Sequence, residues 1–375
     1  MSTTTTHTKE ETPRNLAWHR FRKNPLAMGG LVFILLVALV SLLGPLIRPD
    51  HSVNANDQNL LLARQKPGFE VMTIRMIDKR NSATESARSV AGWFNGGWQS
   101  AYTEIAVQKI ESVTADSVVV NLLPNGERRT FSKNDLIELE SVFITADVYT
   151  FKKSFLLGTD KYGRDLLSRL MAGSSISLLV GAIAVIISLL VGLTLGLIAG
   201  YYRGWIDNVI MWFTNVVWAI PTLILVMAIT FAFGTGFWKV FLAVGLTMWV
   251  EVARIARGQV LSVREKEYVE AARALGFSEM RIIFKHILPN ILSPIIVISA
   301  ANFASAILIE AGLSFLGLGA QIPAPSWGNM IREHYSFITT DLAYLAIIPG
   351  VCIMLLVLSF MLVGNGLRDA LDVRG

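Results

Sequence analysis

Charged residues are scarce in this sequence. Only 16% of its 375 residues are Asp, Glu, Lys or Arg, and 53% are hydrophobic, whereas soluble domains carry about 25% charged residues. A chain this poor in charge does not form an ordinary soluble globular protein. The composition therefore predicts an integral membrane protein, and its net charge of +5 does not need a nucleic-acid partner to explain it.

Cysteine and histidine are also scarce, which excludes two kinds of site. The single cysteine, Cys352, lies within an apolar run, so neither a disulfide framework nor a cysteine metal site is expected. The five histidines show no metal-ligand spacing. We therefore predict no metal site in this chain.

The common catalytic motifs are absent as well. No GxxxxGK[ST] phosphate loop occurs, so the chain is not expected to bind and hydrolyse ATP by itself. No HExxH occurs, and no GxSxG stands in a strand–turn–helix context. These absences predict a non-catalytic protein that has no cofactor of its own.

What the sequence does contain is long apolar runs. A membrane-crossing helix needs about 20 such residues, and six stretches reach this length: 27–47, 174–200, 208–232, 237–255, 291–313 and 343–365. The fourth carries Lys239 and Glu251, and Pro221 in the third predicts a kink. The fold class expected is an all-α membrane protein with six transmembrane helices.

The distribution of Lys and Arg predicts the orientation of these helices. Basic residues precede the first run, fill the 256–290 loop and follow the last run. By the positive-inside rule, both termini and this loop lie in the cytoplasm. The expected order is a cytoplasmic tail over 1–26, a first span over 27–47, an outer segment over 48–155, a five-helix core over 156–366 and a tail over 367–375.

The outer segment 48–155 breaks the membrane pattern. Alternating apolar residues predict strands at 69–77, 103–111 and 117–123, and Asn125-Gly126 is a strong hairpin signal after the third. We expect a small extracytoplasmic α+β domain inserted between the first and second spans. It could be a rigid spacer or stabilising cap, or it could dock another protein or cover a pore.

A polar stretch, 156–177, leads from this domain into the second span. Thr159 or Asp160 could cap a short amphipathic helix whose apolar face contains Leu166, Leu167 and Leu170. A helix of this kind is typical of a membrane interface. Contact with a soluble partner or with substrate at the pathway mouth is the alternative.

The longest polar run in the apolar part of the chain is 264–290, which reads as two amphipathic half-helices. Gly276 predicts a C-cap for the first half, Ser278 an N-cap for the second, and Pro289 should limit the second half. The apolar faces at helical spacing are Tyr268, Ala271, Ala272 and Leu275, then Met280, Ile283, Phe284 and Ile287.

This run could be a solvated loop, a DNA-binding helix-turn-helix or a docking element for a cytoplasmic protein. Membrane spans within a few residues on both sides would keep such a helix out of a major groove, so nucleic acid is not expected. Ala271 and Ala272 allow close backbone approach, and Glu270 offers a charge to an arginine or a helix N-terminus. We favour docking of a protein.

The segment EAARALGFSEMRIIFKHILPN resembles the EAA motif of ATP-binding cassette importer permeases. Its spacing matches at Glu270, Ala271, Ala272, Gly276, Leu288 and Pro289. His286 departs from the general pattern, which has isoleucine, and resembles the peptide-importer branch. The segments FRKNPLAMGGLV, LLGTDKYGRDLLSRL, GYYRGWID, ILIEAGLSFLGLG, PSWGNM and GLRDALD resemble the second permease subunit of dipeptide, oligopeptide and nickel importers.

This resemblance implies the type I importer fold and its partners. The expected partners are a homologous second permease, two cytoplasmic ATPase subunits that hold ATP and Mg, an extracytoplasmic substrate-binding protein and the lipids of a prokaryotic inner membrane. The expected function is ATP-driven import of peptides, with nickel chelates or another small solute as the alternative. The resemblance carries nothing onto 48–155.

Candidate site residues follow from the motif and from polar groups near the spans. The resemblance implies ATPase coupling through Glu270, Ala271, Ala272, Arg273, Gly276, Leu288 and Pro289. Candidates for the substrate pathway are Glu310, Trp327 and Asn329, for each of which a purely structural role is the alternative. An ion-coupled secondary transporter would need several mid-span ionisable groups, and Glu310 is the main one offered. A membrane-anchored enzyme would have to use 48–155, where no recognisable carboxylate pairing occurs.

Overall fold

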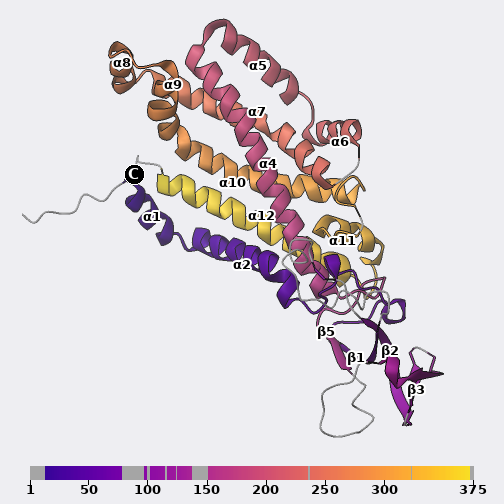
Figure 1. Ribbon diagram of the computed structural model, residues 1–375. Coiled ribbons are helices and arrows are strands. Elements are labelled where there is room, and N and C mark those ends of the chain that lie inside the picture. Colours follow the sequence, from indigo (N-terminus) through magenta and orange to yellow (C-terminus); the bar gives the residue numbers. More distant parts are fainter. Residues whose placement is uncertain are drawn as a thin grey trace, which may run out of the picture. The chain divides into compact units, whose positions relative to one another are not determined.

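A computed structural model of the chain describes residues 13–77, 97–98, 102–114, 116–123, 125–136, 151–234, 237–321 and 323–371 (Figure 1). The chain forms two compact units. Unit 1 contains Met1–Val37, Ser177–Gln321 and Val351–Gly375, and unit 2 contains Ala38–Ile176 and Ile322–Gly350. Helices α2, α4 and α12 contribute residues to both units. Each unit is described by itself below.

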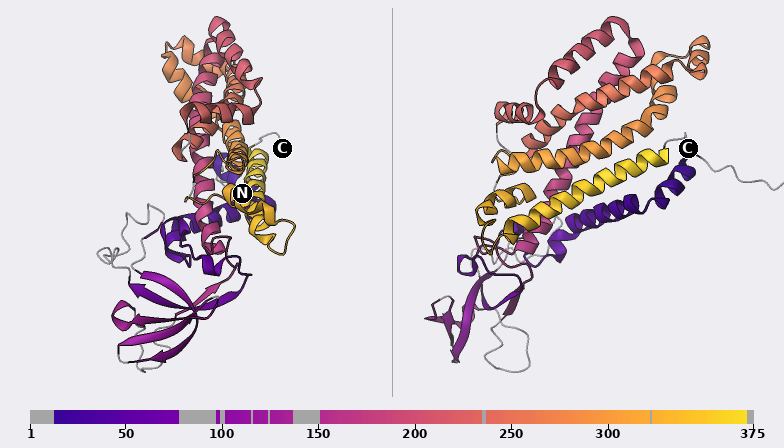
Figure 2. Two further views of the ribbon diagram at one scale, coloured as in Figure 1. Left: turned by 90° about the vertical axis from the view of Figure 1, so that its right-hand side faces the viewer. Right: turned by 180° about the vertical axis from the view of Figure 1, so that it is seen from behind.

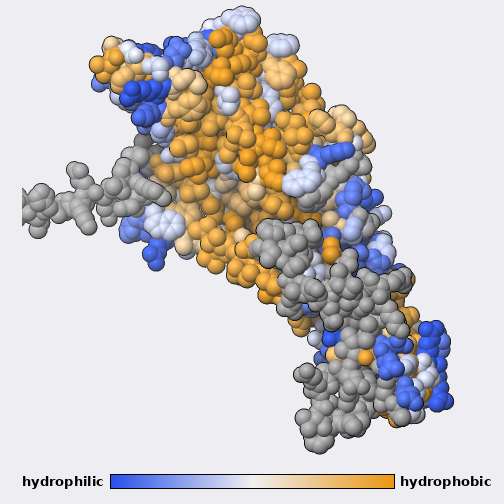
Figure 3. All heavy atoms as spheres, in the orientation of Figure 1, coloured by the Kyte–Doolittle hydropathy of each residue, from blue (hydrophilic) through white to orange (hydrophobic). Residues whose placement is uncertain are grey.

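Long helices make up unit 1. They are α1 (Pro13–Lys23), the first part of α2 (Pro25–Ile47), most of α4 (Leu166–Tyr202), α5 (Gly204–Trp218), α6 (Thr222–Phe233), α7 (Phe237–Arg264), α8 (Glu267–Ala274), α9 (Glu279–Ile282), α10 (Leu288–Phe315) and most of α12 (Tyr344–Leu371). On the face shown in Figure 3, apolar residues cover most of the surface of the long helices, whereas hydrophilic residues gather at α1 and at the α8–α9 end. An apolar exterior is what lipid as a solvent requires.

Among the described helices, up to five candidate membrane spans occur where the sequence predicted six. Four are long and apolar enough to cross a membrane: α2, α4, the continuous helix from α9 through α10, and α12; α5 and α6 together make a fifth. The fourth predicted span corresponds to α7, a continuous helix of 28 residues, but charged side chains along it make it less apolar than the others. The prediction of a helical membrane protein with an inserted α+β domain is confirmed.

Small residues allow α4 and α7 to approach closely. A Cβ added at Gly192 would lie 2.5 Å from the Trp249 carbonyl oxygen, and one at Gly196 would lie 2.6 Å from that of Ala253. These glycines are four residues apart and therefore share a helix face, the spacing typical of close helix pairs in membranes. Any larger side chain there would push the helices apart.

The third predicted span, 208–232, is not one kinked helix. It divides into α5 and α6, which are bent by 94° at the break. Pro221 is the N-cap of α6 and cannot donate a backbone N–H, and its ring restricts the residue before it. The sequence predicted a kink at Pro221. In the structure this kink is a break between two helices and not a bend within one.

Unit 2 contains a five-stranded antiparallel sheet (Figure 2). The strands are β1 (Phe69–Ile77), β2 (Tyr102–Val113), β3 (Ser117–Leu122), β4 (Glu127–Ser132) and β5 (Phe151–Phe155), in the order β4-β3-β2-β1-β5. Alternate residues of β1 belong to different apolar clusters: Ile74 and Met76 pack with one, Phe69 and Val71 with the other. This is the period-2 pattern that predicted the strand.

The predicted hairpin is confirmed. Strands β3 and β4 pair from Ser117↔Ser132 to Leu122↔Glu127, and Gly126 adopts a φ of +70° in the turn between them. Its N–H donates to the Leu122 carbonyl over 2.8 Å. A glycine accepts this left-handed conformation without a Cβ clash.

The predicted short helix capped by Thr159 or Asp160 is wrong. Leu166, Leu167 and Leu170 belong to the first turns of α4, and Asp165 caps it, since its Oδ2 accepts from the Ser168 N–H over 2.8 Å. Asp160 instead accepts from two backbone N–H groups of the preceding turn. Unit 2 also contains the 3-10 turns η1 (Val53–Ala55), η2 (Leu60–Leu62), η4 (Lys133–Asp135) and η7 (Tyr335–Phe337), and α11 (Trp327–His334).

Candidate functional site

The segment Glu267–Ile287, here called the α8–α9 segment, is the main candidate site. Helix α8 ends in a Schellman motif: the Gly276 N–H donates to the Arg273 carbonyl over 2.9 Å, and the Phe277 N–H donates to that of Ala272 over 3.1 Å. Gly276 has a φ of +75°, and a Cβ there would meet no heavy atom within 4 Å. The predicted C-cap glycine is thus confirmed, and its requirement is conformational.

Burial divides the segment into an inner and an outer face. Val269, Ala272, Ile282 and Ile287 are buried in one apolar cluster. The outer face keeps exposed most of the predicted coupling residues and several large apolar side chains: Glu270, Ala271, Arg273, Gly276 and Pro289, with Tyr268, Leu275, Met280 and Phe284. Ala272 is buried and Leu288 is half-buried. Exposed apolar side chains beside charges are typical of a protein-docking surface.

Ser278 occupies the N-cap position of α9, as predicted, although its side chain makes no capping hydrogen bond. Pro289 does not end the second half. Residues Ile283–Ile287, labelled η6, form a π-helical turn that runs directly into α10. The Leu288 N–H donates to the Ile283 carbonyl, one residue farther back than in an α-helix. This wider turn removes the usual clash between a proline ring and the preceding turn, so the helix continues to Phe315.

Two tyrosines at the end of α4 contact the α8–α9 segment and the end of α7. The guanidinium of Arg273 lies 5.5 Å from the centre of the Tyr201 ring, and that of Arg264 lies 5.6 Å from it. The Tyr202 hydroxyl donates to Glu279 Oε2 over 2.9 Å. Sequence analysis did not single out these tyrosines, although aromatic residues beside basic ones in GYYRGW are a detectable signal for such contacts.

Glu270 differs from its charged neighbours. Within the described part of the chain, its carboxylate has neither an ion-pair partner nor a side-chain hydrogen bond, whereas Arg203 pairs with Glu265 and Tyr202 with Glu279. Glu270 lies in the first turn of α8, where the helix dipole favours a negative charge. The free carboxylate is therefore accommodated locally and remains available to another molecule.

The three candidates for the substrate pathway lie in different places. Glu310 is buried in unit 1, and the Ser314 hydroxyl donates to its Oε1 over 2.5 Å. Trp327 and Asn329 are buried in unit 2 at the start of α11, where Trp327 Nε1 donates to the Leu170 carbonyl over 2.9 Å. The Ser326 side chain accepts from the Asn329 N–H and caps the helix. A role in the pathway stays a prediction for all three.

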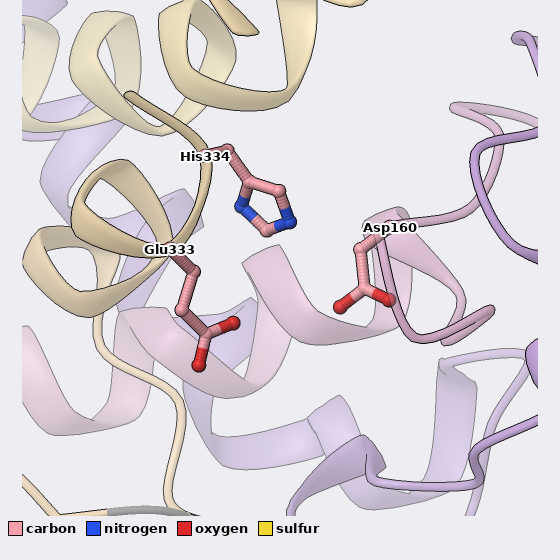
Figure 4. A group of neighbouring side chains, drawn as sticks. All are labelled: Asp160, Glu333 and His334. Carbon is pink, nitrogen blue, oxygen red and sulfur yellow. The ribbon is translucent and has the colours of Figure 1, made fainter. Parts of the chain in front are cut away.

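Unit 2 also contains a buried charged cluster, here called the Arg164 network. Asp160, Glu333 and His334 each offer one ligand atom, and these atoms lie within 4.8 Å of one another (Figure 4). Arg164, however, already donates from Nε to Asp160 Oδ2 over 2.5 Å and from Nη2 to Glu333 Oε2 over 2.6 Å.

These ion pairs make a metal site unfavourable. Arg169 lies 3.9 Å from Asp160, so a metal cation would enter beside two guanidinium groups that repel it. His334 Nδ1 lies 2.8 Å from the Met330 carbonyl. Burial lowers the pKa of His334 more than Asp160 and Glu333 raise it, which favours the neutral ring. The network thus ties α11 to the turn that precedes α4.

Comparison with known families locates the matched parts of the chain. Residues 192–374 match the family described as "Binding-protein-dependent transport system inner membrane component". Residues 12–67 match the "N-terminal TM domain of oligopeptide transport permease C". The segment between the two matches contains the sheet of unit 2.

Individual proteins extend this likeness. A dipeptide transport system permease protein of Alkalihalophilus pseudofirmus is 45% identical over 215 residues, which is 57% of this chain and 70% of the relative. A glutathione transport system permease protein of Pectobacterium atrosepticum is 43% identical over 216 residues, covering 58% and 71%. A methionine ABC transporter solved in inward facing conformations aligns over 55% of this chain and 96% of its own, with 18% identity and a TM-score of 0.44.

Proposed function

Because the chain belongs to the family of binding-protein-dependent transport system inner membrane components, we propose that it is the permease subunit of an ATP-driven peptide importer. The family consists of non-catalytic, multi-pass membrane subunits, so ATP and Mg would be bound by separate ATPase subunits. Dipeptide and glutathione transport by the two relatives supports a peptide as the transported solute.

The exposed α8–α9 segment is the observation on which this proposal depends most. Small residues, a glycine turn and an unpaired carboxylate form a surface that a folded partner can approach closely. We propose that this surface fits a cytoplasmic ATPase subunit. A homologous second permease and an external binding protein would complete the importer, and both termini would lie in the cytoplasm.

The connection of the segment to the bundle supports mechanical coupling. Two residues separate the end of α7 at Arg264 from the start of α8, and the π-turn joins α9 to α10 without a break. A displacement of the α8–α9 segment would therefore act on two helices of unit 1 at once. ATP binding can shift the permease between two states only through such a differential contact.

The coupling proposal is tested in proteoliposomes that contain the complete importer. Gly276→Val should leave assembly of the chain in the membrane intact and abolish ATP-driven peptide uptake, because valine resists a φ of +75°. Gly68→Val is the matched control: Gly68 also has a positive φ of +80° and open space around it, but lies in the inserted domain. Uptake that is unchanged in Gly276→Val would overturn the coupling role.

The transported solute is tested separately. Uptake of a radiolabelled dipeptide and of a nickel chelate is compared in the same proteoliposomes with the cognate binding protein. We expect ATP-dependent accumulation of the dipeptide. Accumulation of the nickel chelate alone would replace the peptide assignment and leave the coupling proposal untouched.

A further inference from the structure

A cavity of about 430 Å³ lies in unit 1 beside the break between α5 and α6. Nine of its thirteen lining residues are apolar, three carry hydroxyl groups and one is charged; they are Val217, Trp218, Ile220, Pro221, Thr222, Leu225, Thr247, Met248, Val250, Glu251, Ser305, Leu308 and Ile309. An apolar cavity of this size with a few polar groups is typical of a small-ligand site.

Glu251 is the charged residue in this wall. Within the described ranges it has no ion-pair partner, although Arg254 follows it by one turn on α7. Arg254 is engaged elsewhere: its guanidinium lies 4.1 Å from the centre of the Trp218 ring, and its Nη2 donates to Asn215 Oδ1 over 2.5 Å. Glu251 is itself exposed at the mouth of the cavity, and a negative charge that has no ion-pair partner within the described ranges attracts a cationic ligand.

The chemistry of the wall selects among cations. A divalent metal ion needs several anionic oxygen ligands, and Glu251 is the one carboxylate here. A primary ammonium donates three hydrogen bonds, for which Glu251 and the hydroxyl oxygens of Thr222 and Ser305 are acceptors. The apolar walls can take the hydrocarbon part of the same ligand.

We propose that Glu251 binds the free amino-terminal ammonium of a peptide during transport. This rests on the proposed function, because peptide import supplies a ligand that has an ammonium at one end and side chains along its length. Trp218, whose ring contacts the Arg254 guanidinium, forms part of the apolar wall. Glu251 is thus a specificity-determining residue for peptides with an unblocked amino terminus.

The position of Glu251 on α7 connects this cavity to the α8–α9 segment. The wall residues Thr247–Glu251 and the end of α7 at Arg264 belong to one continuous helix. With a rise of about 1.5 Å per residue, the carboxylate-bearing turn lies about 20 Å from that end. A movement of α8 that displaces α7 would change the cavity wall and release the bound ammonium.

Direct binding to the complete importer tests this assignment. Trialanine and N-acetyltrialanine are titrated into the purified complex in phosphatidylcholine nanodiscs without ATP or binding protein. The wild type should bind trialanine at least about tenfold more tightly, which is about 1.4 kcal/mol. Glu251→Gln should bind both peptides equally weakly, and Glu251→Asp should restore part of the difference. Glu127→Gln on β4, in the inserted domain, is the carboxylate-to-amide control and should discriminate as the wild type does.

Several outcomes would overturn the proposal. The wild type could bind neither peptide or both equally, or the Glu251→Gln variant could still discriminate between them. Loss of trialanine binding when phosphatidylethanolamine is added would also overturn the proposal, because it would assign the site to a lipid ammonium. ATP-driven uptake is measured in parallel. If the wild-type complex takes up no peptide, the proposed function fails; if Glu251→Gln alone leaves binding and uptake unchanged, only the role of Glu251 fails.

Discussion

The α8–α9 segment of unit 1 and the Arg164 network of unit 2 differ in whether their polar side chains find partners within the chain. In the network, Arg164 is 1% exposed and pairs with two carboxylates of its own chain. In the α8–α9 segment, Glu270 and Gly276 are exposed and contact no partner among the described side chains. Polar residues that satisfy one another stabilise a fold, and polar residues left outward are available to another molecule. The same contrast predicts where substitutions should affect stability and where they should affect transport.

The largest loss of stability is expected for Arg164→Met. Removing the guanidinium breaks the buried ion pair with Asp160, which then has only the more distant Arg169, and takes away the partner of the half-buried Glu333; breaking such a pair costs about 3–5 kcal/mol. Thermal unfolding in detergent measures the loss. Arg128→Met is the control, since Arg128 pairs with Glu111 but its side chain is 68% exposed, and such surface pairs contribute about 1 kcal/mol or less. Equal effects of the two variants would contradict a buried stabilising network.

Gly173→Val should have the next largest effect. A Cβ at Gly173 would lie 2.8 Å from Trp327 Cδ1, and forcing extra atoms into such a contact costs about 1–3 kcal/mol. The same thermal measurement applies to Gly29→Val, because a Cβ at Gly29 meets nothing within 4 Å. If both valines are tolerated equally, Trp327 does not pack as tightly as described.

The third effect is a dependence of stability on pH through His334. Burial holds the pKa of His334 below its ordinary value in the folded protein. Between that lowered pKa and the unfolded value of about 6.5, the imidazole is protonated in the unfolded chain but not in the folded one. The stabilising contribution is complete above about pH 6.5. It is lost as pH falls toward the folded pKa, by at most about 1.4 kcal/mol per pH unit. His334→Gln should remove this slope from melting curves, and a slope that persists would assign it to another group.

Glu270→Lys should have the smallest effect on stability. It should also show most clearly that the α8–α9 segment affects transport whereas the Arg164 network affects stability. Its side chain is exposed and forms no ion pair within the described residues, so the free energy of unfolding should fall only by the unfavourable interaction of a lysine with the N-terminal end of α8, about 1 kcal/mol or less. Uptake by the reconstituted importer should nevertheless be lost, because the charge offered to the ATPase is reversed. A destabilised but transporting variant would reverse the comparison.

Local patterns in the sequence predicted elements whose partners are close by. The strand at 69–77, the hairpin at Gly126 and the caps at Gly276 and Ser278 were predicted by alternation, turn residues and helix-end preferences, and each is confirmed. These features depend on a few adjacent residues and on backbone sterics. They can therefore be recognised without knowledge of the remaining fold.

The wrong predictions share a different cause. Pro289 does not stop its helix, because a π-turn five residues long accommodates the ring. Asp160 caps no helix, because its carboxylate accepts from the Arg164 guanidinium and from the backbone N–H groups of Tyr162 and Arg164. In each case a residue has more than one locally acceptable role, and packing against distant residues selects one.

Hydrophobic length and periodicity alone predict a helical membrane protein with an inserted strand-rich domain, because these patterns reflect lipid and sheet geometry directly. The spacing from Glu270 to Pro289 also points to the family, since it strongly resembles one motif. Which charged residues form internal ion pairs, as Arg164 does, and which face a cavity or the exterior, as Glu251 and Glu270 do, becomes evident only from the folded chain. Charge pairing depends on distances between residues far apart along the chain, and composition and spacing contain no such distances.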